Sequence, residues 1–161
     1  MTRFSKGMLI SAFLVAVPSL GIADPKPRNA QPATAAKITK IYAGKTDVWD
    51  TDCGGGIYFG PNGQARAWCA TNPDTLGAGT WYATNQGQLC HKLKWYYPQG
   101  SGAGVSAEQT SCIDHVDKRW GNTYRNYADS AEWWPIDDYS GPKRGYKFQA
   151  NVKAARAKLG L

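Results

Sequence analysis

The sequence predicts an all-β domain, a small antiparallel meander closed as a barrel, with a short helix before it. Three observations support this prediction. Short runs of β-branched and aromatic residues recur along the chain, and such residues favour strands. Turn signals rich in Gly, Pro, Asn and Asp separate these runs at a spacing typical of small barrels and sandwiches. No helical segment lies between the predicted strands, which argues against a parallel α/β sheet.

Residues 1–23 are predicted to be a signal peptide. Arg3 and Lys6 give a positive start, an apolar stretch covers residues 8–20, and Ala23 ends a small-x-small cleavage signal. The apolar stretch is too short to span a bilayer. We therefore expect a mature chain that begins at Asp24, has no transmembrane segment, and is periplasmic or secreted.

The first part of the mature chain is predicted to be a linker followed by a helix. Residues 24–32 include three prolines and few apolar residues, which is typical of a linker. Residues 33–42 fit a short helix that Thr34 can cap and Gly44 can end. The β-domain is then expected to cover residues 33–148, including this helix. Its first strand is predicted at residues 45–49.

An opening hairpin is predicted around a Gly-Pro-Asn-Gly turn at residues 60–63. Proline presets φ at its first corner, and Asn and Gly tolerate positive φ at the second. Residues 57–59 and 64–69 form its two strands. Further strands are predicted at residues 77–84, 88–97, 109–116, 123–127, 132–136 and 146–148. Residues 98–107 are predicted to be a Gly- and Ser-rich loop, and residues 149–161 form a basic tail that a short helix would suit.

Four cysteines in an exported chain indicate two disulfides, with three pairings open. If Cys90 faces Cys112, the centre of the hairpin falls at Ser101, inside the Gly-rich loop. This geometry favours a Cys90–Cys112 bridge and leaves Cys53–Cys69. No C-x-x-C pattern is present, which argues against a zinc site, and we predict neither a metal nor a cofactor.

The basic charge lies in the tails of the chain. Residues 41–138 carry seven Lys or Arg against eleven Asp or Glu, whereas residues 139–161 carry six basic residues and no acid. A nucleic-acid module would place its charge on the folded face, so no nucleic-acid partner is expected. The tails are either solvated ends or contacts for acidic envelope polymers.

Several short motifs occur together as a series: Ile41-Tyr42-Ala43-Gly44-Lys45-Thr46, Tyr58-Phe59-x-Pro61-x-Gly63, Gly79-Thr80-Trp81, Gly87-x-Leu89-Cys90 and Ser111-Cys112. This series resembles a domain-of-unknown-function family of small exported proteins from rhizobia and related alphaproteobacteria. More distantly it is similar to lipocalin-like envelope proteins. The resemblance covers residues 36–148 and implies a lipocalin-like barrel in a Gram-negative envelope. It implies no activity, ligand or catalytic residue.

The two histidines are predicted to face the interior of the barrel. His91 shares a face with Leu89, Leu93 and Trp95 in an alternating strand. His115 lies four residues beyond the position opposite His91, about 13 Å away at roughly 3.3 Å per residue. A shared metal site is therefore disfavoured. The histidines are either hydrogen-bonded core residues or, with Trp95, polar and aromatic contacts in a ligand cavity.

The tryptophans suggest a binding surface. Trp133 and Trp134 are adjacent, and adjacent strand residues face opposite ways, so one must be exposed or covered by another element. Trp68 shares a face with Arg66. Exposed aromatics beside polar groups suit stacking on sugars or packing on a partner. The alternative, that terminal helices cover these rings, stays open.

The leading functional hypothesis is a non-enzymatic exported binding module of the cell envelope, with a carbohydrate or another envelope component as ligand. A second hypothesis is a protein-interaction module, such as an inhibitor of an envelope hydrolase. A third is a hydrolase that uses the aspartates at positions 47, 50 and 52, or Asp114 and Asp117 beside His115. We predict no enzymatic activity and leave the oligomeric state open.

Overall fold

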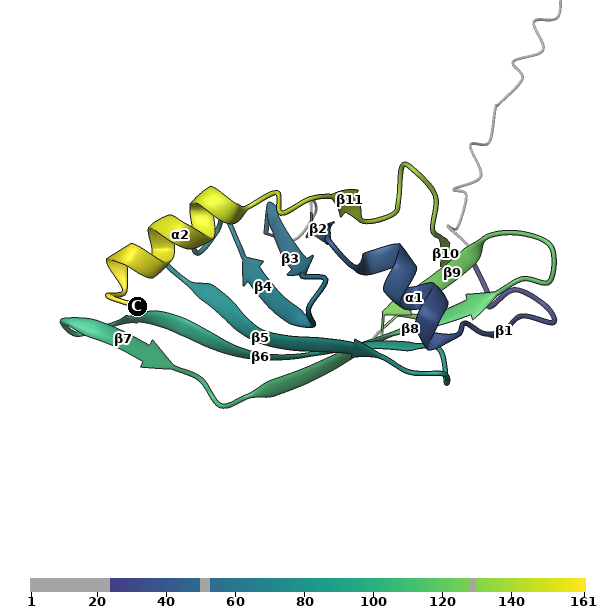
Figure 1. Ribbon diagram of the computed structural model, residues 1–161, viewed down its shortest axis with the longest axis horizontal. Coiled ribbons are helices and arrows are strands. Elements are labelled where there is room, and N and C mark those ends of the chain that lie inside the picture. Colours follow the sequence, from purple (N-terminus) through teal and green to yellow (C-terminus); the bar gives the residue numbers. More distant parts are fainter. Residues whose placement is uncertain (1–23, 50–52, 128–129) are drawn as a thin grey trace, which may run out of the picture.

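A computed structural model describes residues 24–49, 53–127 and 130–161 of the chain. Its strands form one antiparallel sheet that curls into a half-barrel, and two helices pack on it (Figure 1). The strands follow the order β10-β9-β8-β6-β5-β4-β3-β2-β11, while β1 pairs with β8 and β7 pairs with β6. The all-β class and the antiparallel meander are thus confirmed.

The elements have the following bounds: β1 Gln31–Pro32, α1 Ala35–Tyr42, β2 Lys45–Trp49, β3 Gly55–Phe59, β4 Gln64–Trp68, β5 Leu76–Ala83, β6 Gln88–Gln99, β7 Gly102–Val105, β8 Gln109–Asp117, β9 Thr123–Tyr127, β10 Trp134–Pro135, β11 Lys143–Arg144 and α2 Gln149–Lys158. Neither helix of the described part is long and apolar enough to span a bilayer.

The opening hairpin forms as predicted. Gly63 ends its turn with a φ of 80°, a conformation that glycine adopts without the steric cost that a side chain would bring. Strands β3 and β4 then pair in a register that sets Ile57 opposite Ala67. Both side chains are buried and lie on the face that we call the inner face of the sheet.

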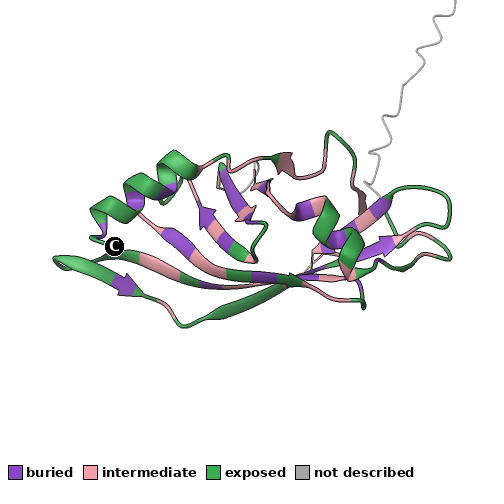
Figure 2. Ribbon diagram, viewed as in Figure 1, coloured by how far each residue is buried: buried purple, intermediate pink, exposed green. Residues whose placement is uncertain are grey.

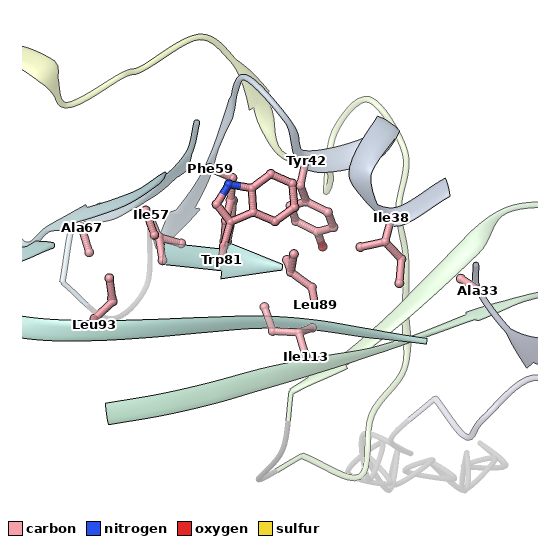
Figure 3. Packing of buried hydrophobic residues seen from close by; sticks show 11 residues of the cluster. Ala33, Ile38, Tyr42, Ile57, Phe59, Ala67, Trp81, Leu89, Leu93 and Ile113 are labelled. Carbon is pink, nitrogen blue, oxygen red and sulfur yellow. The ribbon is translucent and has the colours of Figure 1, made fainter. Parts of the chain in front are cut away.

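The main core lies on this inner face, beneath α1 (Figure 3). Thr34 caps α1 by accepting a hydrogen bond from the Lys37 amide, as predicted, and Tyr42 of the helix points into the core. Phe59 packs edge-to-face against Tyr42 and against Trp81, with ring centroids 5.3 and 5.5 Å apart. Trp81 also donates its indole N–H to the Gly60 carbonyl, so this buried polar group is satisfied.

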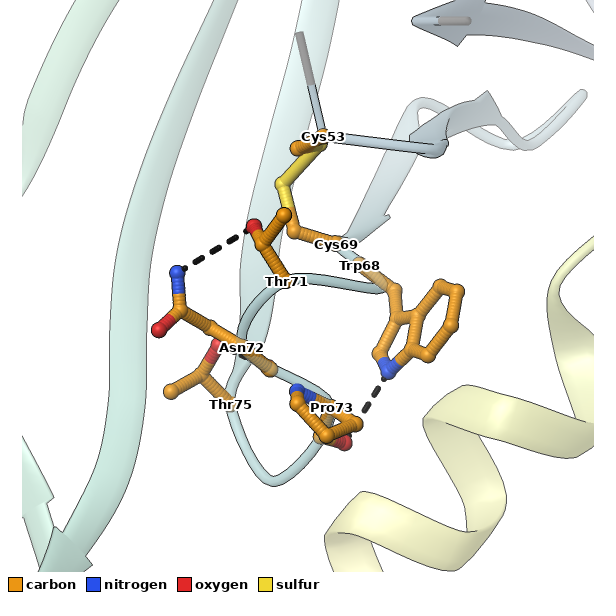
Figure 4. Close-up of a disulfide and its surroundings, with 7 residues drawn as sticks. All are labelled: Cys53, Trp68, Cys69, Thr71, Asn72, Pro73 and Thr75. Atoms are coloured by element: carbon orange, nitrogen blue, oxygen red, sulfur yellow. Dashed lines mark hydrogen bonds between the residues drawn. A yellow bond between two sulfur atoms is a disulfide. The ribbon is translucent and has the colours of Figure 1, made fainter.

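A second core lies on the opposite, outer face of β4 and β5, beneath α2. Trp68 packs there against Val152, Ala155 and Leu159 of the helix and its C-terminal end. Its indole N–H donates to the Pro73 carbonyl at 3.0 Å (Figure 4). Figure 2 shows the resulting pattern, with buried segments in the middle strands and exposed ones on the outer side of α2 and at the β7 hairpin.

Both predicted disulfides are present. Cys90 lies directly opposite Cys112 in the β6–β8 ladder, and His91 lies opposite Ser111, as the hairpin arithmetic requires. Cys53 precedes β3 and joins Cys69, which follows β4, so this bridge ties the open end of the first hairpin (Figure 4). Two disulfides are typical of an oxidising compartment outside the cytoplasm.

Four predictions about individual elements are wrong. Residues 98–107 are not a loop, because β6 extends to Gln99 and β7 pairs back onto it. The predicted linker at residues 24–32 contributes β1. The strand predicted at residues 146–148 is absent, and β11 lies just before it. Finally, the sheet is not closed as a barrel, because β10 and β11 do not pair with each other among the described residues.

Candidate functional site

A cavity of about 820 Å³ lies within the curl of the sheet. Strands from both ends of the sheet line it, together with the segment that joins β10 to β11. Its lining combines aromatic, charged and hydroxyl side chains with a few aliphatic ones. The lining includes Asp47, Trp49, His91, Ser111, Arg125, Tyr127, Trp134, Tyr139, Ser140 and Lys143.

An ion pair joins the two ends of the sheet across this cavity. Arg125 on β9 donates from Nη1 to Asp47 Oδ1 on β2 at 2.6 Å, and Tyr127 donates its hydroxyl to Asp47 Oδ2 at 3.1 Å. Arg125 also donates from Nη2 to the carbonyl of Ser140 at 2.8 Å. We call these four residues the clasp, because they hold β2, β9 and the segment after β10 together without backbone pairing.

The clasp is buried and charged. The side chains of Arg125 and Asp47 are only 11% and 2% exposed. Burial opposes the charge on the guanidinium, but the adjacent Asp47 carboxylate outweighs it and raises the pKa of Arg125 above its ordinary value. Arg125 therefore stays cationic, and the pair places a fixed dipole in the wall of the cavity.

Two buried nitrogens of the cavity have no hydrogen-bond partner among the described residues: Nδ1 of His91 and Nε of Arg125. Burial lowers the pKa of His91, and the negative charge of Asp47 opposes this only in part, so the ring is neutral at pH 7. Buried polar atoms normally have partners. A bound ligand or ordered water that bonds to these nitrogens would satisfy both atoms.

Aromatic rings surround these polar groups. Trp134 packs against Tyr127 with ring centroids 5.8 Å apart, and Trp49 completes the aromatic wall. Tyr139 is 92% exposed, and the ammonium of Lys143 lies 6.0 Å from the centre of its ring. The cavity is thus aromatic inside and has at its edge the ammonium of Lys143, which donates hydrogen bonds to the carbonyls of Asp138 and Tyr139.

The predicted site residues are divided between several places. His91 and Trp134 line the cavity, whereas Trp95 is half-buried on the inner face outside it. Trp133 lies half-buried under Lys26 of the N-terminal segment, whose Nζ is 5.4 Å from the ring centre. One ring of the adjacent tryptophan pair therefore faces the cavity and a separate segment covers the other. The sequence prediction required such an arrangement.

Arg66 and Trp68 lie on the outer face, away from the cavity. The exposed position suggested for Trp68 is wrong, because α2 covers the ring and leaves it 7% exposed. Arg66 donates to the carbonyls of Ala65 and Gly79. The proposed surface made from Trp68, Arg66 and the Trp133–Trp134 pair therefore does not assemble as one patch.

His115 belongs to the core. Its Nδ1 lies 2.9 Å from the carbonyl of Ile113, which can only accept, so Nδ1 carries the proton. Nε2 then accepts a hydrogen bond from the Tyr42 hydroxyl at 2.8 Å. Burial lowers the pKa of His115 to about 4 and raises that of Tyr42. Both groups are neutral and hydrogen-bonded, so His115 has a structural role in the core.

The aspartates do not form a paired site among the described residues. Asp47 is engaged in the clasp, and Asp117 accepts from Lys37 and Thr123. Asp114 lies on the exposed side of β8 and accepts from Gln88. Asp50 and Asp52 lie outside the described residues. No group of three or more His, Cys, Asp or Glu in the described part is placed to hold a metal ion.

Sequence reasoning missed most of the cavity. Asp47 could have been noticed from the sequence, because it is a carboxylate between Thr46 and Val48 in a strand. Its side chain lies on the inner face of the sheet. Arg125 lies in an alternating strand, and no other feature of the sequence pointed to it. Their pairing across 78 residues depends on how far the sheet curls.

The family comparison agrees with the motif series. Residues 10–151 match the model of the family described as "Protein of unknown function (DUF995)". The chain belongs to this family. A search of curated proteins found no match, and a search of solved structures found none. The family description names no activity.

Proposed function

We propose that this protein is a non-enzymatic, exported binding protein of the cell envelope, and that a carbohydrate-type envelope component occupies the cavity in its curled sheet. The observation that carries the proposal is the unpartnered Nδ1 of His91, buried beside aromatic rings in a cavity of about 820 Å³. Ligand sites are commonly concave and mostly apolar, with a few polar groups that fix orientation.

The lining suits a sugar. The apolar faces of sugar rings stack on indole and phenol rings, and Trp49 and Trp134 provide them. Sugar hydroxyls donate and accept, which matches His91 Nδ1, Arg125 Nε and the hydroxyl of Ser111. The ion pair within the clasp cancels its own net charge, so the cavity does not require a charged ligand.

The envelope location and the signal peptide belong to the same proposal. The two disulfides support an oxidising compartment, and the leader-like residues 1–23 support export into the periplasm or beyond it. The half-barrel supports a binding role because its curl holds the cavity, although its end strands do not pair with each other among the described residues. No group in the described cavity is assigned a catalytic role.

The test is an array of bacterial envelope glycans, including peptidoglycan fragments, followed by titration calorimetry with the glycans that bind. Trp134→Ala should lower affinity at least tenfold, because aromatic anchors carry a large share of binding energy. Ser111→Phe should also weaken binding, because it fills the cavity without removing an aromatic contact. Tyr82→Ala is the control, since Tyr82 is 43% exposed and does not line the cavity.

The results separate the candidate functions. Binding that both cavity variants leave unchanged would place the ligand elsewhere. An array without any bound glycan would contradict the carbohydrate assignment. Inhibition of lysozyme by the wild type and by both variants alike would instead favour a protein-interaction module that uses loops and not the cavity.

A further inference from the structure

A second hollow, of about 840 Å³, lies at the end of the sheet away from α2 and shares no lining residue with the cavity. The turn between β8 and β9 and the segment before β1 form it, and Figure 1 shows these two segments side by side. Its lining includes Arg28, Lys37, Asp117, Lys118, Arg119 and Trp120. We call them the basic tip.

The basic tip is strongly positive, with four cations against one carboxylate. Asp117 is already neutralised, because Lys37 Nζ lies 2.7 Å from its Oδ1 and Thr123 donates to the same oxygen. Arg28, Lys118 and Arg119 are exposed and make no ion pair with a described residue. Three cations thus remain available to an anionic partner.

Trp120 stands apart from the other six tryptophans of the chain. It is 87% exposed, whereas the others are buried or half-buried. The turn that carries it is closed by a bond from the Lys118 amide to the carbonyl of Asn122, which places the indole at the tip of a hairpin. A ring this exposed buries little area within the fold and is accessible to a partner outside the chain.

We propose that the basic tip docks on the surface of an anionic lipid bilayer. Tryptophan is enriched at the headgroup level of membranes, where an amphipathic ring is partly apolar and partly hydrated. Basic residues beside it are attracted to anionic headgroups, and each contributes about a fivefold increase in partitioning. Arg28, Lys118 and Arg119 line the same hollow as the indole and supply that attraction.

A bilayer fits this arrangement better than a soluble acidic polymer does. Either partner would interact with the cations. A sugar unit of such a polymer would cover one face of the exposed indole, whereas the interfacial layer of a bilayer surrounds the whole ring with apolar groups beneath the charges. Binding should therefore have two parts. The attraction of the cations to the headgroups is screened by salt, whereas the contribution of Trp120 persists at high salt.

The experiment measures cosedimentation with vesicles of phosphatidylglycerol and phosphatidylethanolamine, and with vesicles of phosphatidylcholine alone. The protein is the chain from Asp24 onward, which contains every helix and strand that the structure describes. Lys118→Gln with Arg119→Gln should lower partitioning into anionic vesicles about 25-fold. Lys94→Gln with Lys153→Gln is the matched control, because it removes two exposed cations elsewhere and should change partitioning little.

Trp120 is tested separately. Trp120→Ala should abolish the binding that persists at high salt, and brominated lipids should quench the wild-type fluorescence more than that of Trp120→Phe. The proposal is overturned if anionic vesicles do not bind the protein, or if the control double variant loses as much as the tip variant. Binding to a soluble polyuronate in place of vesicles would overturn it in favour of a polymer partner. Unchanged circular dichroism of the exposed-site variants excludes unfolding as the cause.

Discussion

Removing the cation of the clasp is the sharpest test of the fold. In Arg125→Ala the carboxylate of Asp47 keeps its buried position, with a side chain only 2% exposed, but loses a hydrogen bond of 2.6 Å to a positive partner. Breaking a buried ion pair on one side typically destabilises a protein by about 3–5 kcal/mol, because the remaining charge is uncompensated. The carbonyl of Ser140 also loses its donor, which adds to the loss.

The magnitude is large compared with the stability of a domain of this size. A domain is stable by about 5–15 kcal/mol, so the variant would lose a substantial part of its unfolding free energy. The assay is urea unfolding at pH 7 with both disulfides intact, followed by circular dichroism. In thermal unfolding the same change should lower Tm by roughly 10–20 °C.

Two comparisons make this prediction specific. Arg125→Met with Asp47→Leu removes both charges, and the double variant should be much closer to the wild type than Arg125→Ala, because no charge is left unpaired. Lys158→Ala removes a cation from an exposed pair with Asp74 and should cost less than about 1 kcal/mol. A loss below 1 kcal/mol for Arg125→Ala would refute the view that the clasp holds the curled sheet together.

The second disulfide, the leader and the buried histidine can each be tested separately. Replacing Cys90 and Cys112 by Ser should lower the unfolding free energy by about 3 kcal/mol in the chain-entropy model, measured by urea unfolding; an unchanged value would show that the β6–β8 ladder does not need the bridge. The intact mass of the exported protein should correspond to a chain beginning at Asp24, and a mass that includes Met1 would contradict export with cleavage. Burial lowers the pKa of His115 to about 4 from an ordinary 6.5, so between these pH values the unfolded chain binds a proton that the folded chain does not. The unfolding free energy should therefore fall by about 3 kcal/mol as the pH drops from 6.5 to 4, and His115→Gln should reduce this decline.

Local patterns predicted the hairpins well. If Cys90 faces Cys112, the centre of the hairpin falls at Ser101 inside the Gly-rich loop, and this agreement favoured the pairing that the β6–β8 register confirms. The opening hairpin depended on turn residues with special backbone freedom, and Gly63 has the positive φ that such a turn requires. Both features depend on residues close in sequence, which is why sequence reasoning found them.

Amino-acid composition led to wrong predictions for two segments whose structure is determined by contacts with neighbouring elements. The Gly- and Ser-rich residues 98–107 lack the packing side chains typical of strands, yet β7 forms because the extended β6 offers it a backbone partner. The aromatic residues 146–148 suited a strand, but Tyr146 stacks on Tyr58 at 4.3 Å and Phe148 packs near Trp68 on the outer face. Their side chains fill the second core instead of joining the sheet.

The cavity could not be predicted from local patterns because its members come from opposite ends of the sheet. The alternation of side chains along a strand assigns Asp47 and Arg125 to the inner face. This alternation does not determine the distance between β2 and β9. That distance depends on the twist and curl that the intervening strands accumulate. His91 was found because it alternates with Leu89 and Leu93, and Trp134 because its neighbour is also a tryptophan.

The open sheet explains why a barrel was a reasonable prediction and still wrong. Barrel closure requires the end strands to share a hydrogen-bonded ladder. Here each end strand, β10 and β11, has two residues, and Pro135 in β10 has no amide hydrogen to donate. The segment that joins them, residues 136–142, therefore spans the gap itself.

Within that segment, Asp137 accepts hydrogen bonds from the amides of Tyr139 and Ser140 and shapes a turn. The turn presents the carbonyl of Ser140 to Arg125, so the clasp fixes the spanning segment as well as the sheet ends. A ladder would fill this gap with paired backbone. A side-chain clasp leaves space beside it, which Tyr139, Ser140 and Gly141 line. The cavity and the missing closure are therefore two consequences of the same pair of short end strands.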